Sequence, residues 1–309
     1  APGTEPAEGR AMSPEQILAH PAKVLTQAQR EAYFDHGYVL LPAFLAPAWL
    51  ARLNAVTAAF IEESRTLTAS NAKFDLEPAH SAAAPKLRRL SFPVDHHEVY
   101  RELAFDSPIV DVAEDLLGPN VCYHHSKLNF KWSGGGEAVK WHQDIQYWPH
   151  TDFSPLTIGI YLADVDDEMG PMGIVPGSHK GRLYDLCDEH GAWNGAIRAA
   201  ELAEAQPERA DYLRGPAGSV TVHNCCAVHG SSPNHSSRVR PLLLQTYAAA
   251  DSFPLQSVGT NGLGAYANTV VRGTRPAYTA IDGRTVPVAP DWSGGYTSIF
   301  DVQQQAAGE

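Results

Sequence analysis

The stretch from residue 121 to residue 250 constrains the fold most, because short β-forming runs alternate there with turn residues. Runs such as Tyr123–Trp132, Leu156–Tyr161, Gly218–His223 and Arg240–Tyr247 read as strands. The chain also holds 25 glycines and 23 prolines, a turn-dense balance typical of β architectures. The pattern predicts a mainly β protein with flanking helices and a double-stranded β-helix core, the jelly-roll or cupin-like architecture.

Helix signals lie upstream of this stretch. Thr26 is suited to cap a helix that ends near His36, before Gly37, and Pro47 begins an amphipathic helix that runs to about Ser64. The run from Ser107 to Gly118 has start and stop signals at its two ends. Residues 65–100 show no clean periodicity, and we expect them to be irregular.

The predicted organisation is one catalytic domain over residues 13–309, preceded by a disordered tail over residues 1–12. Within the domain we expect an N-terminal part of helices and a strand (13–120), the jelly-roll core (121–250) and a C-terminal extension (251–309). The Ala- and Glu-rich segment 183–214 reads as a helical insert over the mouth of the pocket, because long inserts are often lids.

Charge and cysteine usage exclude several classes of partner. A formal charge of −12 argues against nucleic acid and against an anionic membrane surface. No apolar run approaches the roughly 20 residues that span a bilayer. The cysteines Cys122, Cys187, Cys225 and Cys226 have no metal-site spacing, so we expect reduced thiols in a cytoplasmic enzyme. The expected partner is a small-molecule substrate, and the protein is expected to be a monomer or a homodimer.

A metal-binding pattern lies inside the predicted core. His142 and Asp144 are two residues apart, and on an extended strand such residues project from the same face. His-x-acid pairs are weak signals, since chance alone predicts about two in a chain of this composition. We prefer this pair to His96/Glu98 and His150/Asp152, because it closes a predicted strand and a strand positions ligands well.

A downstream segment supplies a third candidate metal ligand and a nearby arginine. His229 follows a short β-rich run, and the turn residues Ser231–Ser237 lead into the strand that begins at Arg240. We read this as an antiparallel hairpin that brings Arg240 back beside His229. Two imidazoles and one carboxylate form the facial triad of non-haem Fe(II) oxygenases, and arginine captures carboxylates with two hydrogen bonds. The predicted metal ligands are therefore His142, Asp144 and His229, with Arg240 beside them.

These motifs resemble the phytanoyl-CoA dioxygenase family of Fe(II)/2-oxoglutarate oxygenases, and within it the ectoine hydroxylase-like branch. The resemblance rests on His142–Asp144, Gly170–Gly181, His229–Ser231 and Arg240, and it extends upstream to Leu25–Pro42. It covers roughly residues 24–250. It implies a dioxygenase that uses Fe(II), 2-oxoglutarate and O2.

The resemblance also implies roles for individual residues. Arg240 would hold the distal carboxylate of 2-oxoglutarate, assisted by Ser231, while Thr157 and Asn129 match co-substrate contacts. His125 stands where ectoine hydroxylases usually carry glutamine, which argues against a simple ectoine hydroxylase. The residues that we expect to contact the substrate are Gln146, Tyr147, Trp148 and Lys127.

The expected reaction is hydroxylation of an unactivated C–H bond of a small metabolite, with succinate and CO2 as co-products. Three alternatives stay open: desaturation or cyclisation by the same iron-centred oxidation, a cupin-type metalloenzyme that does not use 2-oxoglutarate, and a non-catalytic binding protein. A second open question concerns Lys86, Arg88 and Arg89, a basic cluster in an acidic chain. Such a run is usually a solvated loop face. The alternative is an anchor for an acidic substrate.

Overall fold

The computed structural model describes residues 12–133, 137–255, 263–289 and 298–306. The predicted disordered tail, residues 1–12, lies outside the described residues except for its last one. The helices are α1 (Pro14–Ala19), α2 (Gln27–His36), α3 (Pro47–Ser64), α4 (Pro93–His96), α5 (Glu98–Phe105), α6 (Pro108–Leu117), α7 (Leu202–Ala205) and α8 (Ile299–Ala306). The strands are β1 (Tyr38–Leu41), β2 (Phe74–Leu76), β3 (Leu87–Ser91), β4 (Val121–Lys131), β5 (Val139–His142), β6 (Leu156–Tyr161), β7 (Met172–Ile174), β8 (Asp211–Leu213), β9 (Val220–Asn224), β10 (His229–Ser231), β11 (Arg240–Ala249), β12 (Thr269–Arg272), β13 (Tyr278–Ile281) and β14 (Arg284–Pro287).

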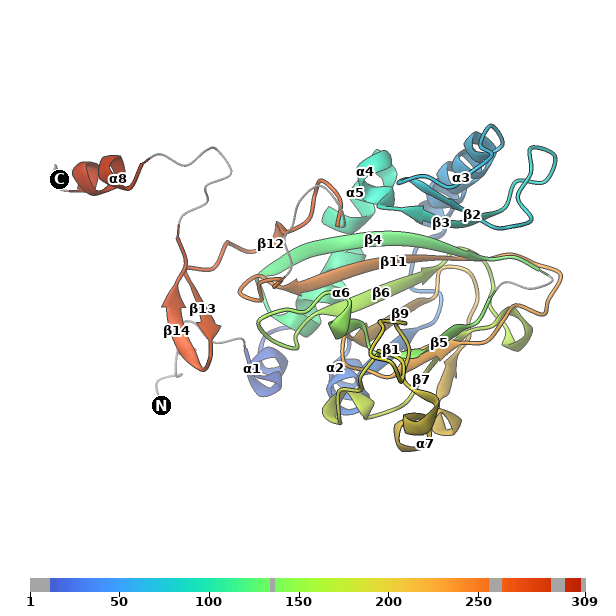
Figure 1. Ribbon diagram of the computed structural model, residues 1–309. Coiled ribbons are helices and arrows are strands. Elements are labelled where there is room, and N and C mark those ends of the chain that lie inside the picture. The colour runs from blue at the N-terminus through green and yellow to red at the C-terminus, as the bar shows by residue number, and fades with distance from the viewer. Residues whose placement is uncertain (1–11, 134–136, 256–262, 290–297, 307–309) are drawn as a thin grey trace.

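Two sheets build the core (Figure 1). The larger sheet has the order β1-β9-β6-β11-β4-β3-β2, with β12 added against β4, and the smaller sheet has the order β5-β10-β7-β8. Neighbouring strands of both sheets are antiparallel. Strands close in sequence often lie in different sheets, as β9, β10 and β11 do, which is the winding of a jelly roll. The predicted fold class is confirmed.

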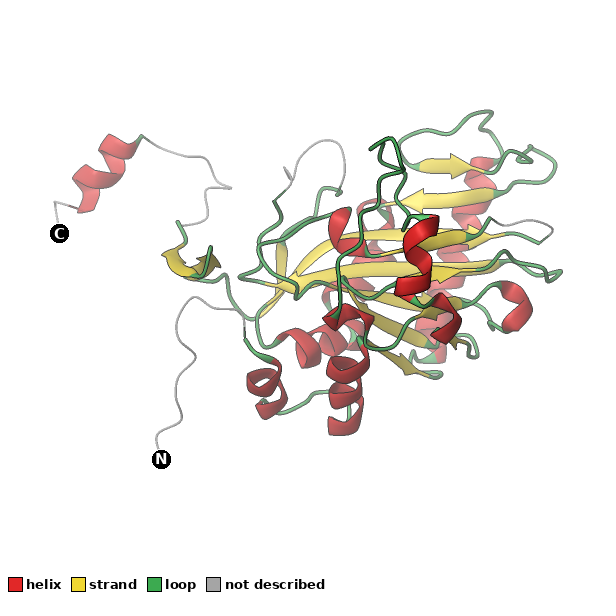
Figure 2. Cartoon of the chain, turned by 60° about the horizontal axis from the view of Figure 1, so that its bottom comes forward, coloured by secondary structure: helices red, strands yellow, loops and turns green. Residues whose placement is uncertain are grey.

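Helices cover one face of the larger sheet (Figure 2). Apolar side chains of α5 and α6 are fully buried in one cluster with side chains of β4, β6, β9 and β11. The helix signals in the sequence explain these elements. Thr26 caps α2 and Gly37 ends it with φ at +83°, while Ser107 caps α6. Because the helices occupy this face, the opposite face of the larger sheet is left to form a cavity with the smaller sheet.

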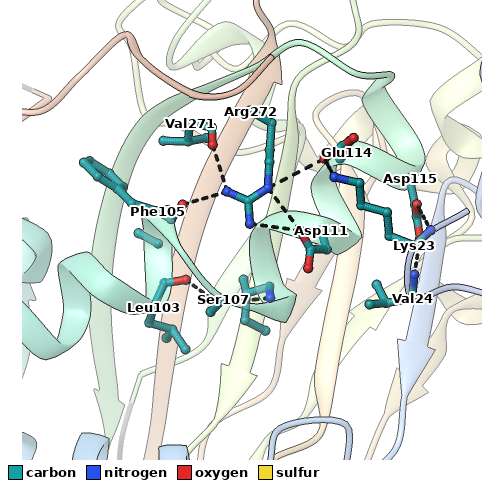
Figure 3. A network of polar contacts seen from close by, with 12 residues as sticks. Lys23, Val24, Leu103, Phe105, Ser107, Asp111, Glu114, Asp115, Val271 and Arg272 are labelled. Carbon is teal, nitrogen blue, oxygen red and sulfur yellow. Dashed lines mark hydrogen bonds and ion pairs between the residues drawn. The ribbon is translucent and has the colours of Figure 1, made fainter.

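A network of polar contacts fastens residues 23–25 and β12 to α6 (Figure 3). The carboxylate of Asp115 is 3% exposed and accepts hydrogen bonds from three successive backbone amides, those of Lys23, Val24 and Leu25, at 2.7–2.9 Å. Arg272 of β12 donates from two nitrogens to Asp111 at 2.9 and 3.0 Å. The N-terminal segment and β12 are therefore held to the same helix by charged hydrogen bonds, which are stronger than neutral ones.

Two predictions about local structure are wrong. Residues 65–100 are not irregular, since they contain β2, β3 and α4 and the start of α5. The segment from β9 to β11 is not a hairpin, because β10 pairs with β5 and β7 in the smaller sheet while β11 pairs with β4 and β6 in the larger one. The turn after β10 crosses between the sheets, and Asn234 secures it by donating to the carbonyls of Lys131 and Arg238.

The segment 183–214 contains α7, β8 and two short 3₁₀ turns, Ala199–Glu201 and Pro207–Arg209. Within the described residues, no helix is both long enough and apolar enough to cross a membrane. Beyond β12, β13 and β14 form an antiparallel hairpin, and Figure 1 shows it with α8 away from the two sheets.

Candidate metal centre and cofactor cavity

The two predicted histidine ligands lie on neighbouring strands of the smaller sheet. His142 ends β5 and is the direct register partner of His229, which begins β10. Their ring centroids are 4.2 Å apart, and both side chains are almost fully buried. The antiparallel pairing therefore brings together two imidazoles that are 87 positions apart in the chain.

Each imidazole is held in one orientation by the backbone. Nδ1 of His142 lies 2.8 Å from the carbonyl oxygen of Lys140, and Nδ1 of His229 lies 2.9 Å from that of Ala227. A carbonyl only accepts, so Nδ1 carries the proton in both rings and Nε2 keeps its lone pair. This is the second-sphere arrangement of metal-binding histidines.

Asp144 completes the cluster from a turn and not from the strand. β5 ends at His142, and Asp144 begins the 3₁₀ turn Asp144–Gln146. The prediction that the pair shares an extended strand is therefore wrong. The reason is Gln143, whose fully buried amide group donates to the carbonyl of Cys226 and accepts from the backbone N–H of Tyr184. These bonds, together with one from the Ile145 amide to the Cys225 carbonyl, turn the chain after His142.

The two oxygens of Asp144 face different partners. Oδ1 lies 3.6 Å from Nε2 of His142 and 3.8 Å from Nε2 of His229. Oδ2 is 3.3 Å from Nε2 of His223 and 3.4 Å from the hydroxyl of Thr157. One oxygen is thus held by the protein, and the other faces the two imidazole lone pairs.

The electrostatics keep His229 and Asp144 in the protonation states that bind a metal. Burial lowers the pKa of His229 well below its ordinary value, and the neighbouring His142 and His223 lower it further. Burial alone would raise the pKa of Asp144, but His229, His142 and His223 together hold it well below its usual range. Neutral imidazole and ionised carboxylate are the ligand forms that a divalent metal requires.

The donor set fits a divalent iron. One ligand atom from each of His142, Asp144 and His229 lies within 4.8 Å of the other two, and no other group of three or more His, Cys, Asp or Glu side chains within the described ranges has this geometry. Two nitrogens and one carboxylate oxygen on one side of a cavity leave the remaining octahedral positions open, which is the pattern of non-haem Fe(II) oxygenases.

Arg240 begins β11 and lies on the same cavity. Its side chain is 3% exposed, and Nη1 donates to the carbonyl of Gly170 at 2.6 Å. Nε is buried without a partner in the described part of the chain, and no described carboxylate pairs with this guanidinium. A buried cation that lacks an anion is strongly unfavourable. The free Nε edge is therefore suited to a carboxylate brought in by a ligand, as the distal carboxylate of 2-oxoglutarate would be.

One cavity of about 1020 Å³ contains most of the predicted site residues. It is lined by the three metal-site residues, by Arg240, and by the predicted co-substrate contacts Ser231, Thr157, Asn129 and His125. Their contacts differ. Ser231 accepts from Nζ of Lys131 at 2.7 Å, Thr157 reaches Asp144 and Thr246, Asn129 accepts from Nε of Arg89 at 2.8 Å, and Nδ1 of His125 lies 2.7 Å from Nδ1 of His124.

Three of the four predicted substrate contacts also line the cavity, namely Tyr147, Trp148 and Lys127. Gln146 does not. Its amide nitrogen donates to the carbonyl of Tyr184 at 2.8 Å, so it is tied to the insert that follows residue 183. Tyr147 likewise donates its hydroxyl to the carbonyl of Gly195. Because Gly195 and its two neighbours line the same cavity, the insert contributes to the wall.

Sequence reasoning missed Lys131, which holds Ser231. It left two other contributors open: Arg89 of the basic cluster, which lies on the cavity wall, and His223, a core or second-sphere imidazole, which contacts Asp144. Alternation along β4 could have found Lys131, because it shares a strand face with His125, Lys127 and Asn129. The apolar strand around His223 does not show which of these two roles it has, and the contact with Asp144 supports the second-sphere role.

Comparisons with known proteins agree with this site. The family described as "Phytanoyl-CoA dioxygenase (PhyH)" matches residues 33–242. A relative from Stutzerimonas stutzeri, named "Probable alpha-ketoglutarate-dependent hypophosphite dioxygenase", is 35% identical over 81% of this chain and 87% of its own length. The "L-proline trans-4-hydroxylase" of Streptomyces griseoviridis is 32% identical over 53% of this chain and 68% of its own length.

Among solved structures, EctD from S. alaskensis with bound Fe superposes with a TM-score of 0.68 at 23% identity, covering 87% of this chain and 94% of that one. At this identity the likeness shows the fold. The named relatives confirm the predicted enzyme class, a dioxygenase dependent on 2-oxoglutarate (alpha-ketoglutarate), with Fe(II), 2-oxoglutarate and O2 as its cofactors. This chain belongs to the phytanoyl-CoA dioxygenase family.

Proposed function

We propose that this enzyme hydroxylates an unactivated C–H bond of a small metabolite, with 2-oxoglutarate as co-substrate and succinate and CO2 as co-products. One observation carries the proposal. The His142, Asp144 and His229 cluster lines the same cavity as Arg240, whose buried Nε has no partner among the described residues. A metal alone would need no buried guanidinium nearby, whereas a keto-dicarboxylate needs both a metal and a cation.

Each residue has a role in this proposal. Nε2 of His142, Nε2 of His229 and Oδ1 of Asp144 would hold Fe(II), which supplies the activation of O2 when it is bound with 2-oxoglutarate. Arg240 and Ser231 would fix the distal carboxylate of the co-substrate, and Lys131 keeps the Ser231 hydroxyl in place. Thr157 and His223 hold Oδ2 of Asp144, so that its other oxygen stays directed at the metal position.

The walls of the cavity would orient the substrate and exclude water. Trp148 is 5% exposed and packs its indole against His124 and His125. Tyr147 stacks edge-to-face on His142 and on Trp193 of the insert. These packed rings would limit the access of water to the reacting groups.

A screen for substrate-stimulated succinate release tests the proposal. Purified enzyme with Fe(II), 2-oxoglutarate and O2 is incubated with small metabolites that carry C–H bonds. A separate arm uses hypophosphite, the compound in the name of the S. stutzeri relative, which has P–H bonds and no C–H bond. Succinate must form only with Fe(II) and must disappear in Asp144→Ala. Product analysis separates hydroxylation from desaturation and cyclisation. Metal-dependent turnover that ignores 2-oxoglutarate would refute the co-substrate assignment.

We also propose that the protein is cytoplasmic, because none of its four cysteines forms a disulfide bond. The proposal also keeps a monomer or homodimer, which sedimentation of the purified protein would distinguish.

A further inference from the structure

The cavity carries more positive charge than the proposed cofactors use. Its described lining holds the cations Arg89, Lys127, Lys140 and Arg240, and the single carboxylate Asp144. In the proposed function, Asp144 binds the metal and Arg240 binds the co-substrate. Lys140 lies on β5 of the smaller sheet, whereas Arg89 and Lys127 lie on neighbouring strands of the larger sheet. Arg89 and Lys127 therefore remain without a role in binding the metal or the co-substrate.

These two side chains occupy one face of neighbouring strands. In the register of β3 with β4, Arg89 lies opposite Asn129 and Ser91 lies opposite Lys127. All four residues line the cavity, whereas Leu90, between Arg89 and Ser91, points into the hydrophobic core with 0% exposure. The strand alternation thus directs Arg89 and Lys127 to the same wall.

Neither cation has an anionic partner in the described part of the chain. Lys127 makes no side-chain hydrogen bond or ion pair there, and Arg89 makes one hydrogen bond, from Nε to the neutral Asn129 at 2.8 Å. The acid closest in register to Arg89 is Asp75, but Arg88 occupies both of its oxygens at 2.8 and 2.9 Å. Burial lowers the pKa of Lys127, Asp144 opposes that shift, and Arg89 adds to it. The folded protein therefore holds two interacting cations, and neither forms an ion pair within the described residues.

We propose that Arg89 and Lys127 bind an anionic group of the substrate, so that the enzyme acts on a small carboxylate or phosphorus oxyanion. The proposal rests on the proposed function, because it places this anion beside the metal and the co-substrate. Arg240 lies on β11 and Arg89 lies on β3, and β4 runs between these two strands. The backbones of β11 and β3 are therefore two strand spacings apart, each of roughly 5 Å. In this assignment the two guanidinium groups bind two different anionic groups, Arg240 that of the co-substrate and Arg89 that of the substrate. Arg89 is exposed as a residue and lines the cavity, and its Nε is occupied by Asn129.

Calorimetric titration under argon tests this assignment. The wild-type protein carries Fe(II) and 2-oxoglutarate, and the probes are propionate, methylphosphonate and the uncharged propionamide. We expect both anions or one of them to bind more tightly than propionamide, and the better anion shows which chemical class the subsite takes. Arg89→Gln should weaken that anion by on the order of tenfold to a hundredfold, the range for loss of a hydrogen bond to a charged group. Arg89→Lys should retain part of the affinity.

Arg88→Gln is the matched control. Arg88 is the residue next to Arg89 and carries the same charge, but it pairs with Asp75 and does not line the cavity. It should bind the probes as the wild type does. Thermal unfolding of each variant reports whether the fold is kept, and Lys127→Met provides a second test at the same subsite.

The outcomes separate the two proposals. If the wild type binds 2-oxoglutarate but prefers neither anion to propionamide, or if Arg89→Gln binds the anion unchanged, the subsite does not exist. Loss of 2-oxoglutarate binding in Arg89→Gln, with anion binding intact, would place Arg89 in the co-substrate subsite and would also overturn the inference. If the wild type binds no 2-oxoglutarate while Arg89 still governs anion binding, the proposed function fails and the anion subsite stands.

Discussion

Replacing Arg240 by methionine removes the guanidinium and keeps an apolar side chain of similar length. In the wild type, Nη1 is occupied by Gly170, so the Nε edge is the part that is free to receive a carboxylate. Two charge-assisted hydrogen bonds along this edge contribute about 3–6 kcal/mol to binding, because each contributes about 1.5–3 kcal/mol. The variant should therefore bind 2-oxoglutarate at least about 100-fold more weakly.

Thermal unfolding under argon with Fe(II) measures this loss. At 100 times its Kd, 2-oxoglutarate stabilises the wild type by about 2.7 kcal/mol. For a chain of this length that raises the melting temperature by about 5 °C. The variant should show almost no rise at the same concentration. Without 2-oxoglutarate it should melt within about 2 °C of the wild type, because burial already lowers the pKa of Arg240 and disfavours its charge.

Arg238→Met is the matched control, since Arg238 precedes β11 and pairs with Asp166 on the surface. It should keep the full rise in melting temperature. An equal rise in Arg240→Met and the wild type would refute the reasoning, because it would mean that the co-substrate binds without this guanidinium.

Three further predictions concern the metal and the fold. Asp144→Ala should abolish tight Fe(II) binding in calorimetry while the fold persists, and undiminished binding would contradict the assigned ligand set. Asp115→Ala leaves three backbone amides without their acceptor and should lower the free energy of urea unfolding by roughly 3 kcal/mol, whereas the exposed Asp35→Ala should change it by less than about 0.5 kcal/mol. Burial next to His150 lowers the pKa of His124 to about 3 in the folded state. In the unfolded chain the same imidazole binds its proton near pH 6.5. The free energy of unfolding should therefore decrease as the pH falls from 6.5 toward 3, by up to about 1.4 kcal/mol per pH unit. His124→Asn should lose less stability over that interval, and an unchanged slope would contradict the assignment.

The triad was predictable because each of its parts has a local signal. His142 closes a run with strand character, and His229 follows another. The helix signals at Thr26, Pro47 and Ser107 were equally local, and the structure places helices there. The sequence did not show which strands pair with each other. The hairpin prediction for the β9–β11 segment failed because two runs separated by turn residues can pair with each other or with strands from elsewhere.

Arg89 shows the same limit at the level of one side chain. Residues 65–100 lack clean periodicity because β2 and β3 are short and connected by a loop over residues 77–86. Without a strand there was no alternation to separate Arg88, which faces Asp75, from Arg89, which faces the cavity. The basic cluster was visible, and under the anion-binding proposal its two alternatives, a solvated face and an anchor for an acidic substrate, apply to the adjacent residues Arg88 and Arg89.

Net charge and local charge answer different questions in this protein. The formal charge of −12 belongs to the whole surface, and at physiological ionic strength fields from exposed charges decay within about 8 Å. Inside the cavity the described cations outnumber the carboxylate Asp144, and low-dielectric walls screen them less than solvent does. The acidic surface therefore disfavours a polyanion, which must contact many surface positions at once. A small anion that enters the cavity meets Arg89 and Lys127 instead, so the charge that argues against nucleic acid does not argue against an anionic substrate.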